Sequence, residues 1–503
     1  MRGPLPRDPA ASPAARGPHP AWLIVLPALG VGLLAVSHPL LAGGVGLLVL
    51  LAAALSRLYG RLPELALGLL GVSLVGYALL GRGYSYLGVA PVFIGEVLLG
   101  TGLLALLLTG RLPLRHTRGL VVLLGLFMLI GAANTLPYLG TYGLDALRDG
   151  VSWAYAAFAL IVAGLLLHLG WVERAVRQYA RVLPWFLLLA PLSLLAFRLF
   201  GSSLPEWPGS GVRILTPKGG DLAVHLSGAL AFLLLGLHRT FRPGERRGRE
   251  WVWWLLWFVG AFSVFTGRAA LLTVGVSVVS LLLLRPRGGW GRPLYLGVLL
   301  LTLLVALNVR VDLGVGREVS AEGLLLNLRS ITEDTGTSTR DGTRAWRLEW
   351  WNDIVNYTVN GPYFWTGKGY GINLADADGF QVSEDRSLRS PHNGHLTFLA
   401  RSGVPGFVAW LLLQGAFALS LLRASAHARA AGRALWANLH LWIFVYWLAF
   451  MTNASFDVFL EGPQGGIWFW SLFGLGLAAL EVYRRGAGSS PRPDELSAER
   501  PPG

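Results

Sequence analysis

Residues 119–140, GLVVLLGLFMLIGAANTLPYLG, contain no charged side chain. A helix that crosses a bilayer needs about 20 consecutive, mostly apolar residues, and this stretch meets that requirement. Outward from it in both directions, similar apolar runs recur between short polar connections. The stretch therefore predicts a membrane-spanning helix, and its repetition predicts a chain that crosses the membrane many times.

The composition of the whole chain supports the same interpretation. Of its 503 residues, 53% are hydrophobic and only 14% are charged, whereas soluble globular proteins have about 25% charged residues. The core of a single soluble domain could not bury this many hydrophobic residues, because domain cores stop growing near about 250–300 residues. Composition thus excludes a soluble enzyme, a coiled coil and a disordered protein.

The apolar runs predict an all-α, polytopic integral membrane helical bundle of about 12–14 transmembrane helices. The predicted spans begin near Ala21, His38, Glu64, Gly88, Gly119, Val151, Leu183, Leu222, Trp251, Arg268, Pro293, Gly403, Leu435 and Gly465. The chain then has five regions: a disordered leader (1–20), the first eleven or so spans (21–308), a large, partly helical extracytoplasmic loop (309–391), the last spans (392–484) and a disordered tail (485–503).

Basic residues orient the chain, which carries 42 Lys+Arg and a net charge of +14. Most of them lie in alternate connections between predicted spans, and cytoplasmic loops are the ones enriched in Lys and Arg. We therefore expect both termini in the cytoplasm and no nucleic-acid partner. With Cys 0, disulfides, thiolate catalysis and Cys-ligated metals are excluded.

The extracytoplasmic loop is basic, against the usual rule for that face of the membrane. Arginines in such a place favour an anionic partner, and the guanidinium fork matches phosphate. Arg268, at the outer end of two predicted spans, is interpreted either as a snorkelling interfacial residue or as an anion ligand. The basic residues of the loop are Arg310, Arg317, Arg329, Arg340, Arg344, Arg347, Lys368, Arg386 and Arg389.

Within this loop, residues 341–359, DGTRAWRLEWWNDIVNYTV, show helical spacing of aromatic and aliphatic residues at Trp346, Trp350, Ile354 and Tyr357. One alternative is an amphipathic helix that lies on the bilayer and touches lipid phosphates. Residues 360–373, rich in glycine, indicate a turn. Residues 374–385 only partly resemble a calcium loop, so we expect no metal site.

Residues 390–413, SPHNGHLTFLARSGVPGFVAWLLL, join the loop to the next predicted span. His392 and Asn393 lie on the same face of the membrane as the arginines, and a neutral histidine is the natural general base for a hydroxyl near pH 7. The other histidines, such as His225 and His427, favour structural roles.

The spacing of His392, Asn393, Gly403 and Gly406 resembles the signature of bacterial O-antigen ligases, which are polytopic inner-membrane enzymes related to O-antigen polymerases. FTGRAALL around Arg268, RLEWW at 347–351 and GPYFWTGKGYG at 361–371 also resemble that family, in the same order.

The resemblance implies a GT-C-like fold and transfer of a glycan from an undecaprenyl-pyrophosphate donor to an acceptor hydroxyl, such as that of lipid A-core, without cofactor or metal. The site would be periplasmic, among membrane lipids. By position, Arg268, Arg347 and secondarily Arg344 would bind the pyrophosphate, and His392 would deprotonate the acceptor. The supporting residues would be Asn393, Trp351, Gly403 and Gly406.

Three alternatives stay open. A polymerase would use the same donor and pocket to join lipid-linked repeat units. A transporter of lipid-linked saccharide would show internal repeats and charges near the membrane midplane, whereas the polar residues here gather at one surface. A purely structural membrane protein would not need these arginines and histidine on one face.

Overall fold

The computed structural model describes residues 60–89, 92–110, 112–208, 210–241, 250–265, 267–285, 290–306, 311–312, 318–319 and 338–488. The chain divides into two units, residues 1–65 and 66–503, and nearly all of the described residues belong to the second. The predicted leader, the spans predicted near Ala21 and His38, and the predicted tail beyond residue 488 lie outside the described residues.

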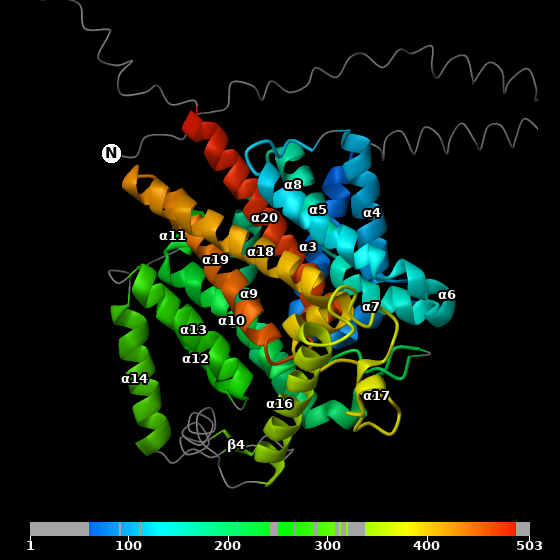
Figure 1. Cartoon of the computed structure of the whole chain (residues 1–503). Helices are drawn as coiled ribbons and strands as arrows, with labels where there is room; N and C mark the ends of the chain where they lie inside the picture. Colours follow the sequence, from blue (N-terminus) through cyan, green and yellow to red (C-terminus); the bar gives the residue numbers. More distant parts are fainter. Residues whose placement is uncertain are drawn as a thin grey trace, which may run out of the picture. The chain divides into compact units, whose positions relative to one another are not determined.

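The described part of the second unit is almost entirely helical (Figure 1). Its short strands form two antiparallel pairs: β1 (Gly88–Val89) with β2 (Val92–Phe93), and β3 (Val311–Asp312) with β4 (Glu318–Val319). The 3-10 helices are η1 (Arg82–Tyr86), η2 (Leu136–Tyr138), η3 (Gly201–Ser203) and η5 (Phe459–Glu461). The α-helices are α3 (Leu62–Leu80), α4 (Ile94–Thr109), α5 (Arg118–Ala133), α6 (Leu139–Tyr142), α7 (Leu144–Ala154), α8 (Ala157–Leu169), α9 (Val172–Phe200), α10 (Gly219–Leu234), α11 (Leu237–Phe241), α12 (Glu250–Val264), α13 (Arg268–Leu284), α14 (Gly291–Ala306), α16 (Ser338–Val359), α17 (Leu374–Asp378), α18 (Gly394–Ala430), α19 (Ala434–Ala454) and α20 (Pro463–Gly488).

These helices confirm the polytopic helical fold. In the described part of the chain, 6 helices are long and apolar enough to cross a membrane, or up to 7 if α7 and α8, bent by 46°, form one span. Shorter apolar helices include α4, α10, α12 and α13. At a rise of 1.5 Å per residue such helices are shorter than the roughly 30 Å hydrocarbon layer. Every span start predicted from Glu64 onward falls in, or just ahead of, one of these apolar helices.

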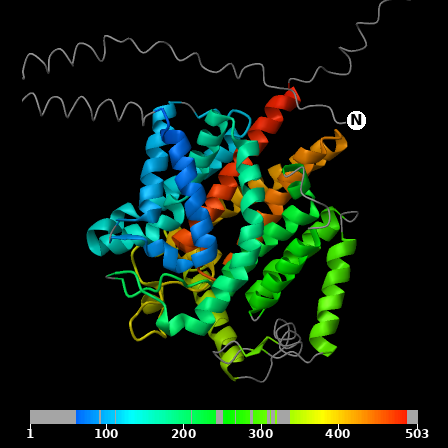
Figure 2. The same ribbon diagram turned by 180° about the vertical axis from the view of Figure 1, so that it is seen from behind.

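The centre of the bundle is formed by the last helices of the chain. The apolar window of α20 is 83% buried and that of α19 is 67% buried. The close approach of α20 to α8 depends on a small residue at the contact. A Cβ at Gly474 of α20 would lie 2.7 Å from the carbonyl oxygen of Ala159 in α8. By contrast, α9 lies at the back of the bundle (Figure 2) and exposes apolar side chains such as Trp185 and Leu192, as a lipid-facing helix does.

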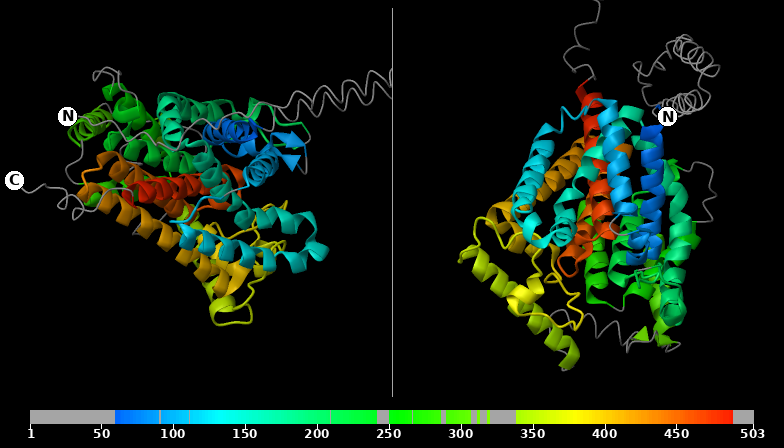
Figure 3. Two further views of the ribbon diagram at one scale, coloured as in Figure 1. Left: turned by 90° about the horizontal axis from the view of Figure 1, so that it is seen from above. Right: turned by 90° about the vertical axis from the view of Figure 1, so that its right-hand side faces the viewer.

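The two ends of the bundle differ. At one end, connections predicted to be cytoplasmic contact one another: Glu481 of α20 accepts a hydrogen bond from the backbone of His116 (2.9 Å), and Arg429 donates to Leu284 (3.0 Å). At the other end lie residues 338–391, which we call the cap, with α16 and α17 (Figure 1, and Figure 3, right).

The cap has its own apolar core. Trp350 and Ile354 of α16 are fully buried against Leu374 of α17 and Leu399 of α18, and Trp346 and Tyr357 pack against the same cluster. The residues that sequence spacing placed on one face of a helix therefore contact protein. The alternative in which this aromatic face lies on the bilayer is wrong, because the face is covered by α17 and α18.

The cap is joined to α18 at a break in that helix. Gly403 has φ 63° and ψ −169° inside α18, a conformation that glycine alone adopts readily. The turn at 364–369 enters the gap: Val404 donates its backbone N–H to Phe364 (2.8 Å), and Lys368 donates to the carbonyl of Ala400 (2.7 Å). The span predicted to begin near Gly403 thus continues a helix that already starts at Gly394.

Candidate functional site

His392 occupies a constrained position between the cap and α18. Its φ of 54° is unusual for a residue with a side chain, and strain of this kind clusters at functional sites. On one side, the Trp351 ring nitrogen donates to the carbonyl of Pro391 (2.8 Å). On the other, Asn393 caps α18 by accepting from the backbone N–H groups of His395 (3.0 Å) and Leu396 (3.1 Å). The His392 side chain is 29% exposed.

A carboxylate that sequence reasoning missed lies beside His392. Oδ1 of Asp457, in the connection between α19 and α20, is 3.9 Å from Nδ1 of His392. Lys218 Nζ donates to both carboxylate oxygens (2.7 and 2.6 Å), and the Val458 N–H donates to Oδ1 (2.8 Å). Burial raises the pKa of Asp457, but its contacts with His392 and Lys218 outweigh burial and hold the pKa well below its usual range.

Two of the predicted arginines lie in the same region. Arg347 of α16 donates to the carbonyl of Phe456 (3.3 Å), the residue before Asp457. Its Nε is buried and has no hydrogen-bond partner among the described residues. Burial lowers the pKa of Arg347, Asp457 raises it, and the positive charge of Arg268 lowers it further. Arg268, the first residue of α13, is therefore close enough to act on the Arg347 guanidinium.

The remaining predicted site residues, Arg344, Gly403 and Gly406, contribute no described side-chain contact to the region around His392. Arg344 lies in α16, but its side chain is outside the described part of the structure. Gly403 and Gly406 serve packing: a Cβ at Gly403 would lie 2.4 Å from the Phe364 carbonyl oxygen, and one at Gly406 would lie 2.2 Å from the Ser402 side chain. Gly403 thus holds the cap turn against α18, Gly406 allows close packing beside Ser402 and Ile130, and neither carries a polar side chain to the site.

The other histidine of this segment is engaged elsewhere. His395 Nδ1 accepts from the Trp410 ring nitrogen (3.1 Å), so its Nε2 carries the proton and donates to the carbonyl of Met451 (3.0 Å). Further histidines are hydrogen-bonded in the bundle, as expected: His225 to Tyr446 and His427 to Tyr483, each at 2.6 Å.

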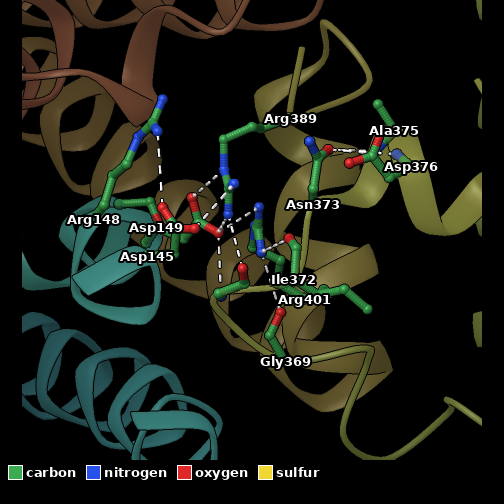
Figure 4. Close-up of polar contacts among 12 residues, drawn as sticks. Asp145, Arg148, Asp149, Gly369, Ile372, Asn373, Ala375, Asp376, Arg389 and Arg401 are labelled. Carbon is green, nitrogen blue, oxygen red and sulfur yellow. Dashed lines mark hydrogen bonds and ion pairs between the residues drawn. The ribbon is translucent and has the colours of Figure 1, made fainter. Parts of the chain in front are cut away.

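Some cap arginines do not face an open site. Arg389 from the cap and Arg401 from α18 converge on Asp149 of α7 (Figure 4), with closest distances of 2.9 and 3.0 Å. Arg389 also donates to the Gly371 carbonyl (2.8 Å) and Arg401 to that of Gly369 (3.2 Å). The expectation that the outer arginines act together on an external anion is wrong for Arg389, because Asp149 is its partner within the chain.

Metal-binding geometry is missing from the described residues, which contain no group of three or more His, Asp or Glu side chains that could hold an ion. Positive charge in this region comes from Lys218, which contacts Asp457, from Arg347, which contacts Phe456, and from Arg268, which acts on Arg347. Such a region attracts phosphate groups, and it also contains a histidine able to accept a proton.

Comparison with known protein families adds an independent observation. Residues 253–411 match the family model of the O-antigen ligases. The matched segment contains Arg268, Arg347, His392 and both signature glycines, whereas Asp457 and Lys218 lie outside it. No curated protein matches the chain.

Proposed function

We propose that this chain moves a glycan from undecaprenyl pyrophosphate to an acceptor hydroxyl, with lipid A-core as the leading acceptor. The match of residues 253–411 to the family model of the O-antigen ligases supports this proposal. The reaction would take place at the periplasmic face of the bacterial inner membrane. The observation that carries the proposal is the position of His392 and Arg347 beside the connection that contains Asp457, with Arg268 close to Arg347.

His392 would act as the general base. Its Nδ1 faces Asp457, so the neutral ring with a proton on Nδ1 leaves Nε2 free to accept the proton of the acceptor hydroxyl. The carboxylate would stabilise the imidazolium that forms, as in other His–carboxylate pairs. The 3.9 Å separation is longer than a hydrogen bond, and catalytic hydrogen bonds often tighten only when substrate is bound.

Arg347 and Arg268 would stabilise the leaving group. As the acceptor oxygen forms a bond to the anomeric carbon, the bond from that carbon to the pyrophosphate oxygen breaks and its electrons stay on the pyrophosphate. Fixed cations aimed at this developing charge are a large catalytic contribution. The buried, unpartnered Nε of Arg347 supports this role, because an oxygen of the pyrophosphate would supply its missing acceptor.

Purified protein supplied with undecaprenyl-pyrophosphoryl oligosaccharide and lipid A-core tests the proposal. The expected products are glycosylated lipid A-core and free undecaprenyl pyrophosphate, both resolved by mass spectrometry, with no divalent metal added. Growth of the lipid-linked chain without transfer to lipid A-core would identify a polymerase. Movement of intact donor across a vesicle membrane, with no covalent change, would contradict transferase activity and favour a transporter.

A further inference from the structure

A pocket lies on the cap, away from His392. It has a volume of about 490 Å³ and is lined by Asp353, Asn356 and Tyr357 of α16, Lys368 of the glycine-rich turn and Asp378 of α17. This volume lies within the roughly 300–1,000 Å³ typical of small-molecule sites. Asp353 and Asn356 are exposed, so the pocket opens to the surface.

One wall of the pocket is rigid. The buried Asp378 carboxylate accepts from the Trp350 ring nitrogen (2.6 Å) and the Tyr357 hydroxyl (3.3 Å), and it pairs with Lys368. The Lys368 ammonium also lies 4.2 Å from the Tyr357 ring centroid and 5.6 Å from that of Tyr363. These contacts hold the Tyr357 ring and the Lys368 ammonium group of the pocket in one arrangement.

The pocket also contains two polar side chains of α16. The side chains of Asp353 and Asn356 have no hydrogen-bond or ion-pair partner among the described residues. Together they offer carboxylate and amide oxygens as acceptors and an amide NH₂ as donor. The aromatic ring of Tyr357 beside these acceptors and donors matches a ligand ring that has an apolar face and several hydroxyl groups.

The charge of the pocket argues against phosphate. Two carboxylates and one ammonium line it, so its formal charge is negative, unlike the region around Arg347 and Arg268. A polyhydroxylated ring without phosphate, such as a neutral or amino sugar, is the ligand chemistry that fits both the charge and the hydrogen-bonding groups.

The pocket and the proposed reaction site share α16. Arg347 and Asn356 are nine residues apart on this helix, which corresponds to roughly 14 Å along its axis and to opposite sides of it. A ligand that occupies both sites must therefore extend around α16. The sugar that reacts would not fill the pocket, but a sugar further along the same glycan would.

We propose that this pocket binds a sugar unit of a substrate glycan at a distance from the reacting bond. The proposal rests on the proposed transferase function. It implies that the cap selects for glycan length or composition, separately from recognition of the pyrophosphate. The glycan can belong to the donor or to the acceptor, since the recognised chemistry is the same.

Transfer kinetics of the full chain, with a doubly substituted Asp353→Asn, Asn356→Ala protein, distinguish the two sources. Undecaprenyl-pyrophosphoryl donors with one sugar and with several repeat units are compared, each against complete and truncated lipid A-core. If the pocket holds donor glycan, KM for the long donor rises about tenfold, whereas kcat and the KM for the one-sugar donor stay within twofold. If it holds acceptor glycan, the same rise occurs only in KM for the complete acceptor.

Matched controls come from the same helix. Glu349→Gln and Asn352→Ala remove an exposed carboxylate and an exposed amide outside the pocket, and they should change neither KM. Unchanged KM values for every glycan in the doubly substituted protein would overturn the proposal.

Direct binding separates this proposal from the proposed function. Saturation-transfer NMR with a lipid-free, pyrophosphate-free oligosaccharide should show contact with the wild-type protein and a large loss in the doubly substituted protein, even if no transfer is detected. Equal signals from both proteins would contradict sugar binding in the pocket, whatever the outcome of the transfer assay.

Discussion

Two pairs of arginines at the cap end of the bundle have opposite surroundings. Arg389 and Arg401 share the carboxylate of Asp149, whereas Arg347 and Arg268 lie near each other, and the adjacent Asp457 is held by Lys218. The pKa of Arg389 shows the effect of its partner. Burial lowers this pKa, but the contacts with Asp149 raise it by more, so the pKa lies above its ordinary value. The pKa of Arg347 is instead lowered, because burial and the positive charge of Arg268 together outweigh the opposite effect of Asp457.

Position in a basic outer loop therefore does not identify an anion site. The Asp149 carboxylate joins the cap and α18 to α7, and its removal takes this counter-charge from two largely buried arginines. Arg347 instead has a buried Nε with no hydrogen-bond partner among the described residues, so an added anion would stabilise it. Substitutions in the two groups test this division, and we order them by decreasing effect on transfer.

Replacing His392 by alanine should have the largest effect. Removal of a general base lowers kcat by about 10²–10⁴-fold, and the partly exposed side chain contributes little to packing, so the melting temperature in detergent should stay close to that of the wild type. His168→Ala, an exposed histidine at the end of α8, serves as the control. Normal turnover in the His392→Ala protein would remove this residue from the mechanism.

Replacing Arg347 by alanine should lower kcat/KM by about 10²–10³-fold, the range for loss of one group that stabilises developing charge. Arg347→Lys should recover only part of this, because an ammonium group lacks the guanidinium fork. Arg386→Ala, an exposed cap arginine, should leave the rate unchanged. Equal losses for Arg347→Ala and Arg386→Ala would mean that the cap charge acts only collectively.

Replacing Asp457 by asparagine should lower kcat by about tenfold, since the imidazolium of His392 would lose its counter-charge. The wild-type carboxylate has a lowered pKa, so its stabilising contribution is fully present above about pH 4, its ordinary pKa. That contribution is lost only as the pH falls further. A pH–rate profile in which Asp457→Asn matches the wild type would show that this carboxylate does not assist His392.

Replacing Asp149 by asparagine should affect stability more than chemistry. Breaking a buried pair costs about 3–5 kcal/mol, so the melting temperature should fall, while kcat/KM per folded molecule changes by no more than a few fold. Asp145→Asn is a milder comparison, because its carboxylate is half exposed and lies 3.5 Å from Arg389. A loss of transfer without a loss of stability would place Asp149 in the reaction and break the division between the two arginine pairs.

Sequence alone predicted the helices of the described region well, because each apolar run carries its own signal. The spacing of Trp346, Trp350 and Ile354 predicts a helix over residues 341–359, and α16 spans Ser338–Val359. The sequence does not predict what covers that aromatic face, because periodicity reveals an apolar face but not the element that packs against it. The structure provides the partner, in α17 and α18.

The sequence alone does not predict which charged residues pair with one another. Asp149 and Arg389 are 240 residues apart, and no local pattern links them. Asp457 follows α19 in a short connection on the predicted outer side, and a charged residue in that position is the signal for it in the sequence. The role of Gly403 depends on its φ of 63° and on the approach of Phe364, both of which are tertiary features.

Binding of the lipid pyrophosphate to purified variants tests the central claim most directly. In a titration with undecaprenyl pyrophosphate, His392→Ala should bind with wild-type affinity, because its side chain acts on the acceptor. Arg347→Ala should bind at least tenfold more weakly, the loss of one charged hydrogen bond. Wild-type affinity in Arg347→Ala would contradict the assignment of the pyrophosphate to this pair of arginines.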